Sequence, residues 1–301
     1  MAIENAVAQE LLVAGLRPKK TWYARLGKIA KKKPMGTVSA IVLSILLLMA
    51  IFANVIGRYD PIAAERVVGA ALQEPSAAHW LGTDQSGRDV WARIIHGARI
   101  SLYVGFIAVT IGVGVGVVVG LVSGYFMGWF DMLIQRVVDV VLGFPSLILL
   151  MALASVLEPS TQTAMVAISF IIWPGISRTI RAACLTVSQN QYVEAAQAIG
   201  ASSTRIMFYH VTPQCFAPII VLASVQIGFA IIIEASLSFL GLGTQPPTPS
   251  WGMMLSEGRR FIETAWWLGL FPGLAISLVV LSFNMMGDTL RDVLDPRLRG
   301  A

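Results

Sequence analysis

Two carboxylates stand inside long apolar stretches of the sequence, where an ionisable side chain is energetically costly. Glu234 lies among isoleucines and alanines, and it could face an aqueous pathway or serve as a buried structural carboxyl with hydrogen-bond partners. Asp139 follows Arg136 by three residues, so an ion pair on one helix face is the simpler interpretation there. The chemistry that such positions would permit is a relay of protons.

Motifs for enzymatic chemistry are missing from the sequence. No segment matches G-x-x-x-x-G-K-[ST], so the chain lacks a glycine-rich loop for nucleotide phosphates, and we expect ATP and Mg²⁺ to bind another subunit. The three histidines, His79, His96 and His210, form no H-E-x-x-H pair, and no G-x-S-x-G elbow is present. We therefore expect a chain without catalytic residues, metal ligands or a cofactor of its own.

A polar stretch at residues 190–213 has the capping residues of a helical hairpin. Asn190 can N-cap a first helix that runs through Ile199, and Gly200 can take the left-handed conformation that ends it. Ser202 or Ser203 can cap a second helix, which we expect to stop before a proline. The first helix carries small residues that would let a partner approach closely: Ala195, Ala196 and Ala198. From these residues alone, a passive connector and a docking site are equally good interpretations.

The elements around this hairpin are predicted to cross a membrane. The 301 residues are 56% hydrophobic and only 13% charged, where a soluble domain carries about 25% charged residues. A bilayer core needs roughly 20 apolar residues per helix. Six segments qualify, the fourth being short and interrupted by Pro174 and Gly175: 37–56, 102–122, 137–157, 161–177, 219–240 and 266–286. The first lies too deep and runs too long for a cleavable signal peptide.

Basic residues predict the orientation of these spans. Eight Lys and Arg residues precede position 34, just before the first apolar run, which is typical of a cytoplasmic segment. Six crossings then place both termini and residues 123–136, 178–218 and 287–301 inside, with fifteen basic residues against seven outside. The last two spans carry tryptophans near their outer ends that would suit the headgroup level: Trp251, Trp266 and Trp267.

The second predicted span has glycines at every fourth position. Such a spacing lines one helix face and lets another backbone approach closely, so we interpret it as a packing surface rather than a ligand contact. The residues are Gly112, Gly116, Gly120 and Gly124.

The hairpin residues resemble a known family. Glu194-Ala195-Ala196, followed by Gly200 and then Pro213, is similar to the EAA loop of ABC-importer permeases, although His210 and Thr212 stand where many members have aliphatic residues. The resemblance implies that this loop is a coupling helix seated on a separate ATPase. The coupling positions that it implies are Glu194, Ala195, Ala196, Gly200, Arg205 and Pro213.

Three further motifs, in the same order as in the family, narrow the resemblance to the "C" permeases for dipeptides, oligopeptides, glutathione and nickel. They are residues 81–102, which begin L-G-T-D-Q-S-G-R-D, residues 238–252, and the tail 287–296. The resemblance covers about residues 30–300 and does not specify the cargo. It implies an all-α, MetI-like bundle of six transmembrane helices. Its parts would be an arm (1–35), an anchor (36–57), a periplasmic segment (58–100), a core (101–290) with a coupling loop (184–217), and a tail (291–301).

The resemblance also implies partners in a bacterial cytoplasmic membrane: a homologous permease, two ABC ATPase subunits and a periplasmic or lipid-anchored solute-binding protein. No nucleic acid is expected. In the outer segments, Asp84 and Asp89 flank Arg88 and favour a local ion-pair network, with a partner contact as the alternative. We expect the basic, amphipathic stretch 90–100 to lie flat on the outer surface. The stiff loop with Pro246, Pro247 and Trp251 is a candidate contact for the binding protein.

Two other functions are compatible with a polytopic chain. A secondary transporter would use Glu234 or Asp139 as a proton relay, and its uptake would survive without ATPase subunits. A scaffold or channel would transport nothing against a gradient, and it would not bind ATPases.

Overall fold

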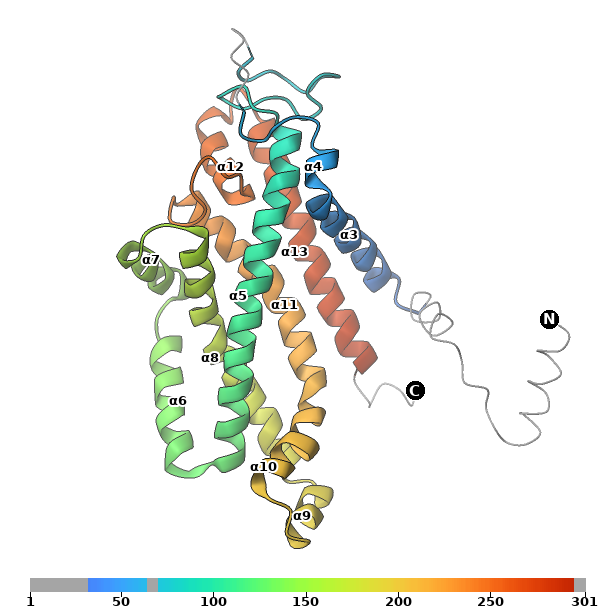
Figure 1. Ribbon diagram of the computed structural model, residues 1–301, viewed down its shortest axis with the longest axis vertical. Coiled ribbons are helices and arrows are strands. Elements are labelled where there is room, and N and C mark those ends of the chain that lie inside the picture. The colour runs from blue at the N-terminus through green and yellow to red at the C-terminus, as the bar shows by residue number, and fades with distance from the viewer. Residues whose placement is uncertain (1–31, 64–69, 295–301) are drawn as a thin grey trace, which may run out of the picture.

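The computed structural model describes residues 32–63 and 70–294, and in this part of the chain the predicted all-α fold is confirmed (Figure 1). Among the described residues, the only β pairing is an isolated bridge between Thr83 and Asp89. The helices are α3 (Pro34–Ile51), α4 (Ala53–Ile56), α5 (Val90–Phe126), α6 (Gly128–Leu142), α7 (Ser146–Val156), α8 (Thr161–Ser188), α9 (Gln191–Ala198), α10 (Ser203–Ile206), η1 (Met207–Val211), α11 (Thr212–Phe239), α12 (Trp251–Gly258), η2 (Arg259–Phe261) and α13 (Trp267–Leu294).

Five helices in the described ranges are long and apolar enough to cross a membrane, and α6 with α7 makes a sixth candidate that is bent by 88°. The prediction of one continuous helix at 137–157 is therefore wrong. Helix α6 ends at Leu142, with Gly143 as its C-cap. Pro145 precedes α7, and proline lacks an N–H and disfavours helical geometry in the residue before it. Figure 1 shows α7 projecting sideways from the bundle.

Elsewhere the helices pass through their prolines. Helix α8 continues through Pro174 to Ser188, so the predicted short fourth span is wrong, and α11 likewise continues through Pro218. The second hairpin helix does not stop before Pro213 either. It runs through α10 and the π-helix η1 directly into α11, giving one apolar rod over residues 203–239. Neighbouring helices in a bundle can compensate for the one bond that each proline removes.

The stretch 90–100 does not lie flat on the surface. It forms the first turns of α5, where the Asp89 side chain accepts the Ala92 N–H at 2.8 Å, and most of its residues are buried. The predicted outer segment 58–100 therefore includes the first turns of α5, which begins at Val90. The anchor 36–57 consists of α3 and the short α4. Of the arm 1–35 and the tail 291–301, residues 1–31 and 295–301 lie outside the described residues.

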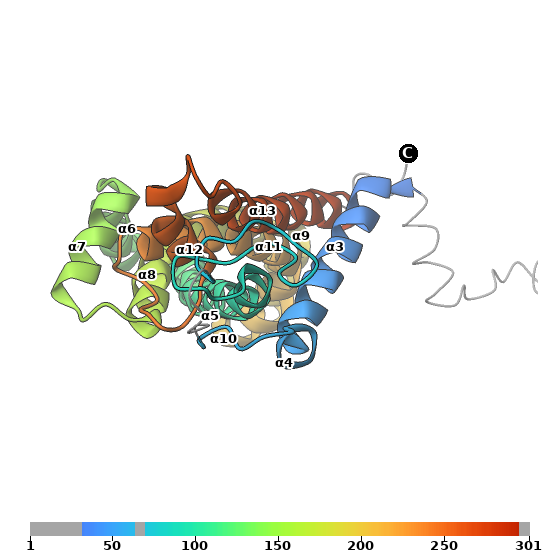
Figure 2. The same ribbon diagram turned by 90° about the horizontal axis from the view of Figure 1, so that it is seen from above.

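Helices α5 and α8 form the centre of the bundle, where they make its most extensive helix contact. Helix α11 packs against both of them, and α13 packs against α11. Viewed from above, α6 and α7 lie on one side of this centre and α3 on the other (Figure 2). Helix α3 packs mainly against α13 and α5, and it leaves most of its apolar side chains exposed. The fold therefore has two ends, one with α9 and α10 and the other with α12.

Candidate coupling site and the opposite end of the bundle

The hairpin at the α9 end has the local structure that its capping residues predict. Asn190 occupies the N-cap position of α9, although its side chain makes no capping hydrogen bond. Gly200 follows the helix with φ of 81°, a left-handed conformation that favours glycine. The Gly200 N–H bonds to the Gln197 carbonyl at 2.9 Å, and the Ala201 N–H bonds to the Ala196 carbonyl at 3.0 Å. This pair of bonds is a Schellman cap, which turns the chain sharply at the tip of the molecule.

Helix α9 has a buried face and an exposed face. Val193 and Ala196 are buried against the base of the hairpin, whereas Glu194 and Ala195 are exposed. Ile199 beside them is 86% exposed, which is unusual for so large an apolar side chain. Ala196, which the resemblance places at a partner contact, packs its methyl group into its own chain. The surface left for a partner contains Glu194, Ala195 and Ile199.

The second half of the hairpin combines a cap, a free charge and a wide helical turn. The Ser202 hydroxyl caps α10 by accepting the Arg205 N–H, and the Arg205 side chain is exposed, with no ion pair to any described residue. In η1, the Thr212 N–H and hydroxyl both bond to the Met207 carbonyl, the hydroxyl at 2.8 Å. This wider turn relieves the crowding that Pro213 would cause in an α-helix. Thr212, unusual for the resembled loop, thus stabilises the junction with α11.

The tip of the hairpin presents aromatic side chains beside these charges. Phe208 and Tyr209 are exposed, and the Tyr192 hydroxyl donates a long hydrogen bond of 3.4 Å to the His210 carbonyl. Below them, buried apolar residues of α8, α9, α10, η1 and α11 belong to the core of the bundle: Cys184, Val193, Ala196, Ile206, Val211 and Cys215. The hairpin is therefore attached firmly to two long helices while its outer face stays open.

The four glycines of α5 lie on the face that contacts α8. A methyl group at Gly116 would come within 2.7 Å of the Trp173 carbonyl, and one at Gly120 within 2.6 Å of the Ser177 carbonyl. Gly112 and Gly124 are similarly close to Ser169 and Arg181. The two backbones thus pack closely enough to move as one body, and α8 leads directly to the hairpin.

At the α12 end, two arginines and two acids form a buried network. Arg88 pairs with Asp84 at 2.6 Å and with Glu257 of α12 at 3.2 Å. Arg93, whose side chain is 1% exposed, pairs with Glu257 at 2.8 Å and with Asp84 at 3.3 Å. The predicted ion pairing of Asp84 with Arg88 is confirmed, but Asp89 pairs with His79 instead, at 2.9 Å. Sequence reasoning missed Arg93 and Glu257, since nothing local relates residues 164 positions apart.

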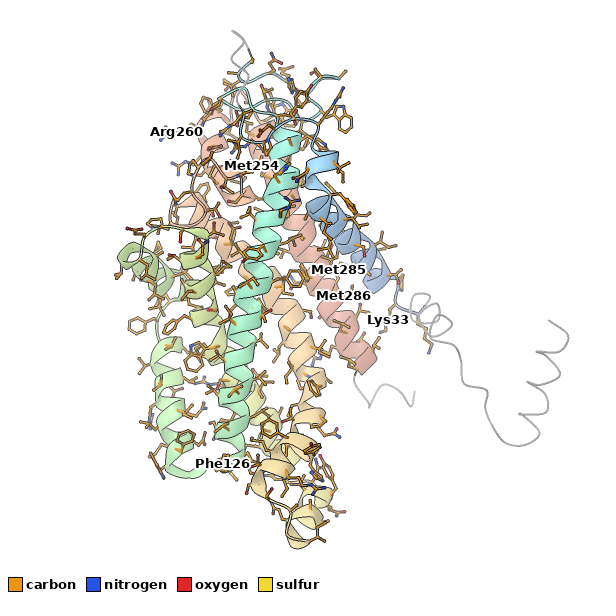
Figure 3. The ribbon with its side chains drawn as sticks, viewed as in Figure 1. Lys33, Phe126, Met254, Arg260, Met285 and Met286 are labelled. Atoms are coloured by element: carbon orange, nitrogen blue, oxygen red, sulfur yellow. The ribbon has the colours of Figure 1, made fainter. Side chains whose placement is uncertain are left out.

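Several residues predicted to contact a partner at this end are buried within the chain. Asp84 and Arg88 are held within the network, and Trp251 is 0% exposed, with its Nε1–H donating to the Ile94 carbonyl at 3.0 Å. Trp267 is also buried, and it donates to the Thr83 carbonyl at 3.2 Å, so only Trp266 suits a headgroup position. Pro246 and Pro247 are exposed and stay candidates for an outer contact. Figure 3 places Met254 and Arg260 at this end, opposite Phe126 near the hairpin end.

Glu234 is a fully buried carboxylate with hydroxyl partners. Ser101 of α5 donates to one carboxylate oxygen at 2.9 Å, and Ser238 of the same helix donates to the other at 2.8 Å. The Ser238 hydroxyl also accepts the Thr244 N–H at 3.1 Å. These contacts favour the interpretation as a structural carboxyl, because they tie α5, α11 and the loop before α12 together.

Two ion pairs connect α6 to α8. Asp131 is buried and bonds to Arg181 and to the Ser123 hydroxyl of α5. Asp139 pairs with Arg178 of α8 and not with Arg136, so the predicted pair within one helix is wrong. Arg178 lies on the helix packed beside α6, whereas Arg136 points to the surface. Sequence alone gave no signal for either pair, because α6 and α8 meet only in the folded bundle.

This arrangement defines a class of protein. A bundle of apolar spans, with a rigid exposed hairpin at one end, is suited to moving helices against a partner. A permease chain of the MetNI methionine ABC transporter, solved in inward-facing conformations, has the same fold. The TM-score is 0.59 over 68% of this chain and 97% of that chain, at 16% identity. The fold is that of an ABC-transporter permease.

Sequence comparison identifies the family. Residues 116–300 match the model "Binding-protein-dependent transport system inner membrane component". The dipeptide transport system permease protein DppC of Escherichia coli (strain K12) is 49% identical over 89% of this chain and 91% of its own length. DppC of Alkalihalophilus pseudofirmus is 46% identical over 90% and 89%, and the probable D,D-dipeptide permease DdpC of E. coli K12 is 40% identical over 92% of both. The chain therefore belongs to the binding-protein-dependent permeases of ABC importers.

Proposed function

We propose that this chain is one of two homologous permeases of an ATP-driven peptide importer in a bacterial cytoplasmic membrane. The observation that supports peptides as the cargo is the 46–49% identity to dipeptide permeases over about nine tenths of the chain. Di- and oligopeptides are the cargo that this similarity favours, with glutathione or a nickel chelate as related alternatives. The chain itself catalyses no reaction and holds no cofactor. ATP and Mg²⁺ bind the two ATPase subunits.

The hairpin of residues 190–213 is the proposed contact with an ATPase subunit. Its support is the combination of a rigid base with an open outer face, on which Glu194 and Arg205 have no ion-pair partner among the described residues. Exposed apolar side chains beside the charges, Ile199 and Tyr209, add area that a protein partner would bury. When the ATPases close on ATP, the hairpin moves, and α8 and α11 move with it.

The basic excess supports an orientation with the hairpin and both termini in the cytoplasm. The α12 end then faces the periplasm, where a solute-binding protein delivers the cargo to a surface that includes Pro246 and Pro247. An open apolar groove of about 420 Å³ lies between α7, α11, α12 and α13. It supports the proposal of a second permease subunit, since one chain alone leaves this groove uncovered. Residues of α7 and α11 line it, among them Leu147, Met151 and Phe239.

A direct test is co-purification and transport with a charge reversal on the hairpin. Glu194→Lys should weaken retention of the ATPase subunits and lower ATP-dependent peptide uptake into proteoliposomes, because it reverses an exposed charge at the proposed contact. Glu158→Lys is the matched control, since Glu158 is an exposed acid in the connection between α7 and α8. Equal ATPase retention and uptake in both variants would contradict the coupling role.

The same preparation separates the rival functions. Uptake that persists without ATPase subunits and collapses with the proton gradient would indicate a secondary transporter. A complex that retains no ATPase subunits and shows no ATP-dependent accumulation would indicate a scaffold or channel.

A further inference from the structure

A cavity of about 330 Å³ lies where α3 begins and α13 ends, and the proposed transport function makes no use of it. One wall comes from the first turn of α3 and the two lysines before it, and the other comes from the last turns of α13. Figure 3 labels one residue of each wall, Lys33 and Met285. At one edge the two helices touch, because a methyl group on Gly36 would overlap the Thr289 side chain. The cavity is therefore built from both helices.

Two cations and two anions line this cavity. Lys33 and Asp292 form an ion pair at 2.5 Å, and their side chains are 42% and 40% exposed. Lys32 and Asp288 also line the cavity, but neither forms an ion pair with a described residue. Asp288 and Asp292 are four residues apart, so α13 presents both carboxylates on one face. The cavity thus offers one unpaired cation and one unpaired anion beside a complete ion pair.

The rest of the lining is largely apolar and continues onto the surface of α3. Pro34, Met35 and Met285 belong to this part of the lining. Helix α3 is a candidate membrane span that begins at Pro34, and most of its apolar side chains are exposed. Lysines 31–33 directly precede the span, as basic residues do at the headgroup level of a membrane. An acyl chain can therefore follow α3 while the headgroup of the same lipid occupies the cavity.

The charges of the cavity match a headgroup that carries both a phosphate and a primary ammonium. A lysine donates charge-assisted hydrogen bonds to phosphate oxygens, and a carboxylate accepts them from an ammonium group. Basic pockets between transmembrane helices bind anionic headgroups. Here two carboxylates offset the two lysines, so a headgroup without a cation would leave the acids unpaired. The balance of charge favours a zwitterion.

From these observations we infer that the cavity between the start of α3 and the end of α13 binds the headgroup of one phospholipid of the phosphoethanolamine class. Lys32 binds its phosphate and Asp288 binds its ammonium group, while the Lys33–Asp292 pair stays intact. The bound lipid fastens the anchor α3 to α13, one of the two helices on which α3 mainly packs. The inference requires α3 to span a membrane, and it is independent of the cargo and of the ATPase subunits.

The first experiment compares three lipids on the purified permease complex. Delipidated complex in detergent is titrated with phosphatidylethanolamine, phosphatidylglycerol or phosphatidylcholine of identical acyl chains, and native mass spectrometry measures the bound lipid. Phosphatidylglycerol lacks the ammonium, and the methylated ammonium of phosphatidylcholine has no N–H to donate. We expect phosphatidylethanolamine to bind at least roughly tenfold more tightly than either, which is the size of one charge-assisted hydrogen bond. Equal affinities for the three lipids would overturn the inference.

Substitutions of Asp288 test whether the lipid occupies this cavity. Asp288→Asn should abolish the preference for phosphatidylethanolamine, and Asp288→Lys should reverse it in favour of phosphatidylglycerol. Both variants should assemble normally, because Asp288 is exposed and forms no ion pair with a described residue. Glu263→Gln is the matched control, since Glu263 is an exposed acid just before the opposite end of α13 and its loss should leave the preference unchanged. A wild-type preference in both Asp288 variants would overturn the site, because the lipid would then bind elsewhere.

The phosphate contact is tested separately at Lys32. Lys32→Gln should weaken phosphatidylethanolamine binding about tenfold, since it removes the cation assigned to the phosphate. Unchanged binding would overturn that assignment. A complex that prefers phosphatidylethanolamine but takes up no peptide would overturn the proposed function alone, whereas full peptide uptake without any lipid preference would overturn the lipid site alone.

Discussion

The two ends of the bundle treat charge in opposite ways. At the α12 end, Asp84, Arg88, Arg93 and Glu257 form ion pairs with one another inside the fold. At the α9 end, Glu194 and Arg205 stay on the surface, and neither forms an ion pair with a described residue. In the first arrangement, the charged side chains are paired with one another within the chain. The second arrangement leaves its charged side chains available for a partner.

This difference separates charges that are paired within the fold from charges that are available to a partner. A buried network becomes costly when it is broken, since the remaining charges lose their compensation. An exposed, unpaired charge contributes little to folding, so its removal should act on association alone. Substitutions at the α12 end should therefore lower the free energy of unfolding most, whereas substitutions at the α9 end should mainly weaken ATPase binding.

The largest loss of stability is expected for Arg93→Met. It removes a buried guanidinium that pairs with both Glu257 and Asp84, and breaking such a pair costs about 3–5 kcal/mol. The measurement is the free energy of unfolding in detergent. Arg260→Met is the control, because Arg260 is exposed at the same end and its loss should change stability by less than about 0.5 kcal/mol. Equal stability of the two variants would show that the network contributes nothing.

An intermediate loss is expected between the two ends, at the α5–α8 contact. Gly116→Ala places a methyl group 2.7 Å from the Ile176 Cβ and from the Trp173 carbonyl, and such overpacking typically costs about 1–3 kcal/mol. Gly114→Ala, two residues away, has no atom within 4 Å of its new methyl group and should be neutral. Unfolding of both variants in detergent tests this, and a neutral Gly116→Ala would contradict the close packing.

Local chemistry explains what the sequence could predict. Gly200 ends α9 and Ser202 caps α10 because these signals depend only on a few neighbouring residues. The glycine face of α5 was likewise readable, since a period of four places Gly112 to Gly124 on one side of a helix. The family followed from motifs in the same order, which the similarity to dipeptide permeases agrees with.

Tertiary contacts explain the features that the sequence alone could not predict. Whether Trp251 is covered depends on α5, whose Ile94 carbonyl accepts its N–H from a distance of 157 residues in sequence. Which face of α9 is buried likewise depends on how the hairpin packs on α8 and α11, so Ala196 could not be told from Ala195. Pro174 looked like a helix break, but the packed bundle stabilises a helix through it.

A smaller effect is expected at the hairpin turn. Gly200→Ala forces a side chain into φ of 81°, a conformation that costs an L-residue about 1–2 kcal/mol. Gly200→Asn should lose less, because asparagine tolerates the left-handed region. Measuring the free energy of unfolding of both variants tests this order, in which the alanine variant is less stable than the asparagine variant. The reverse order would indicate that the turn does not keep this conformation in solution.

The smallest effect on stability is expected for Glu194→Gln. This variant tests most directly whether the α9 end differs from the α12 end. The side chain is exposed and makes no ion pair with a described residue, so the free energy of unfolding should change by less than about 0.5 kcal/mol. Loss of a charge at the proposed contact should nevertheless weaken ATPase binding, measured by titrating purified ATPase subunits onto the permease complex. The buried carboxylate Glu234 gives the opposite control, since Glu234→Gln should disturb its serine partners and lower stability first. If Glu194→Gln unfolded more easily while ATPase affinity stayed unchanged, the hairpin would be a structural element like the opposite end, and the contrast between the two ends would disappear.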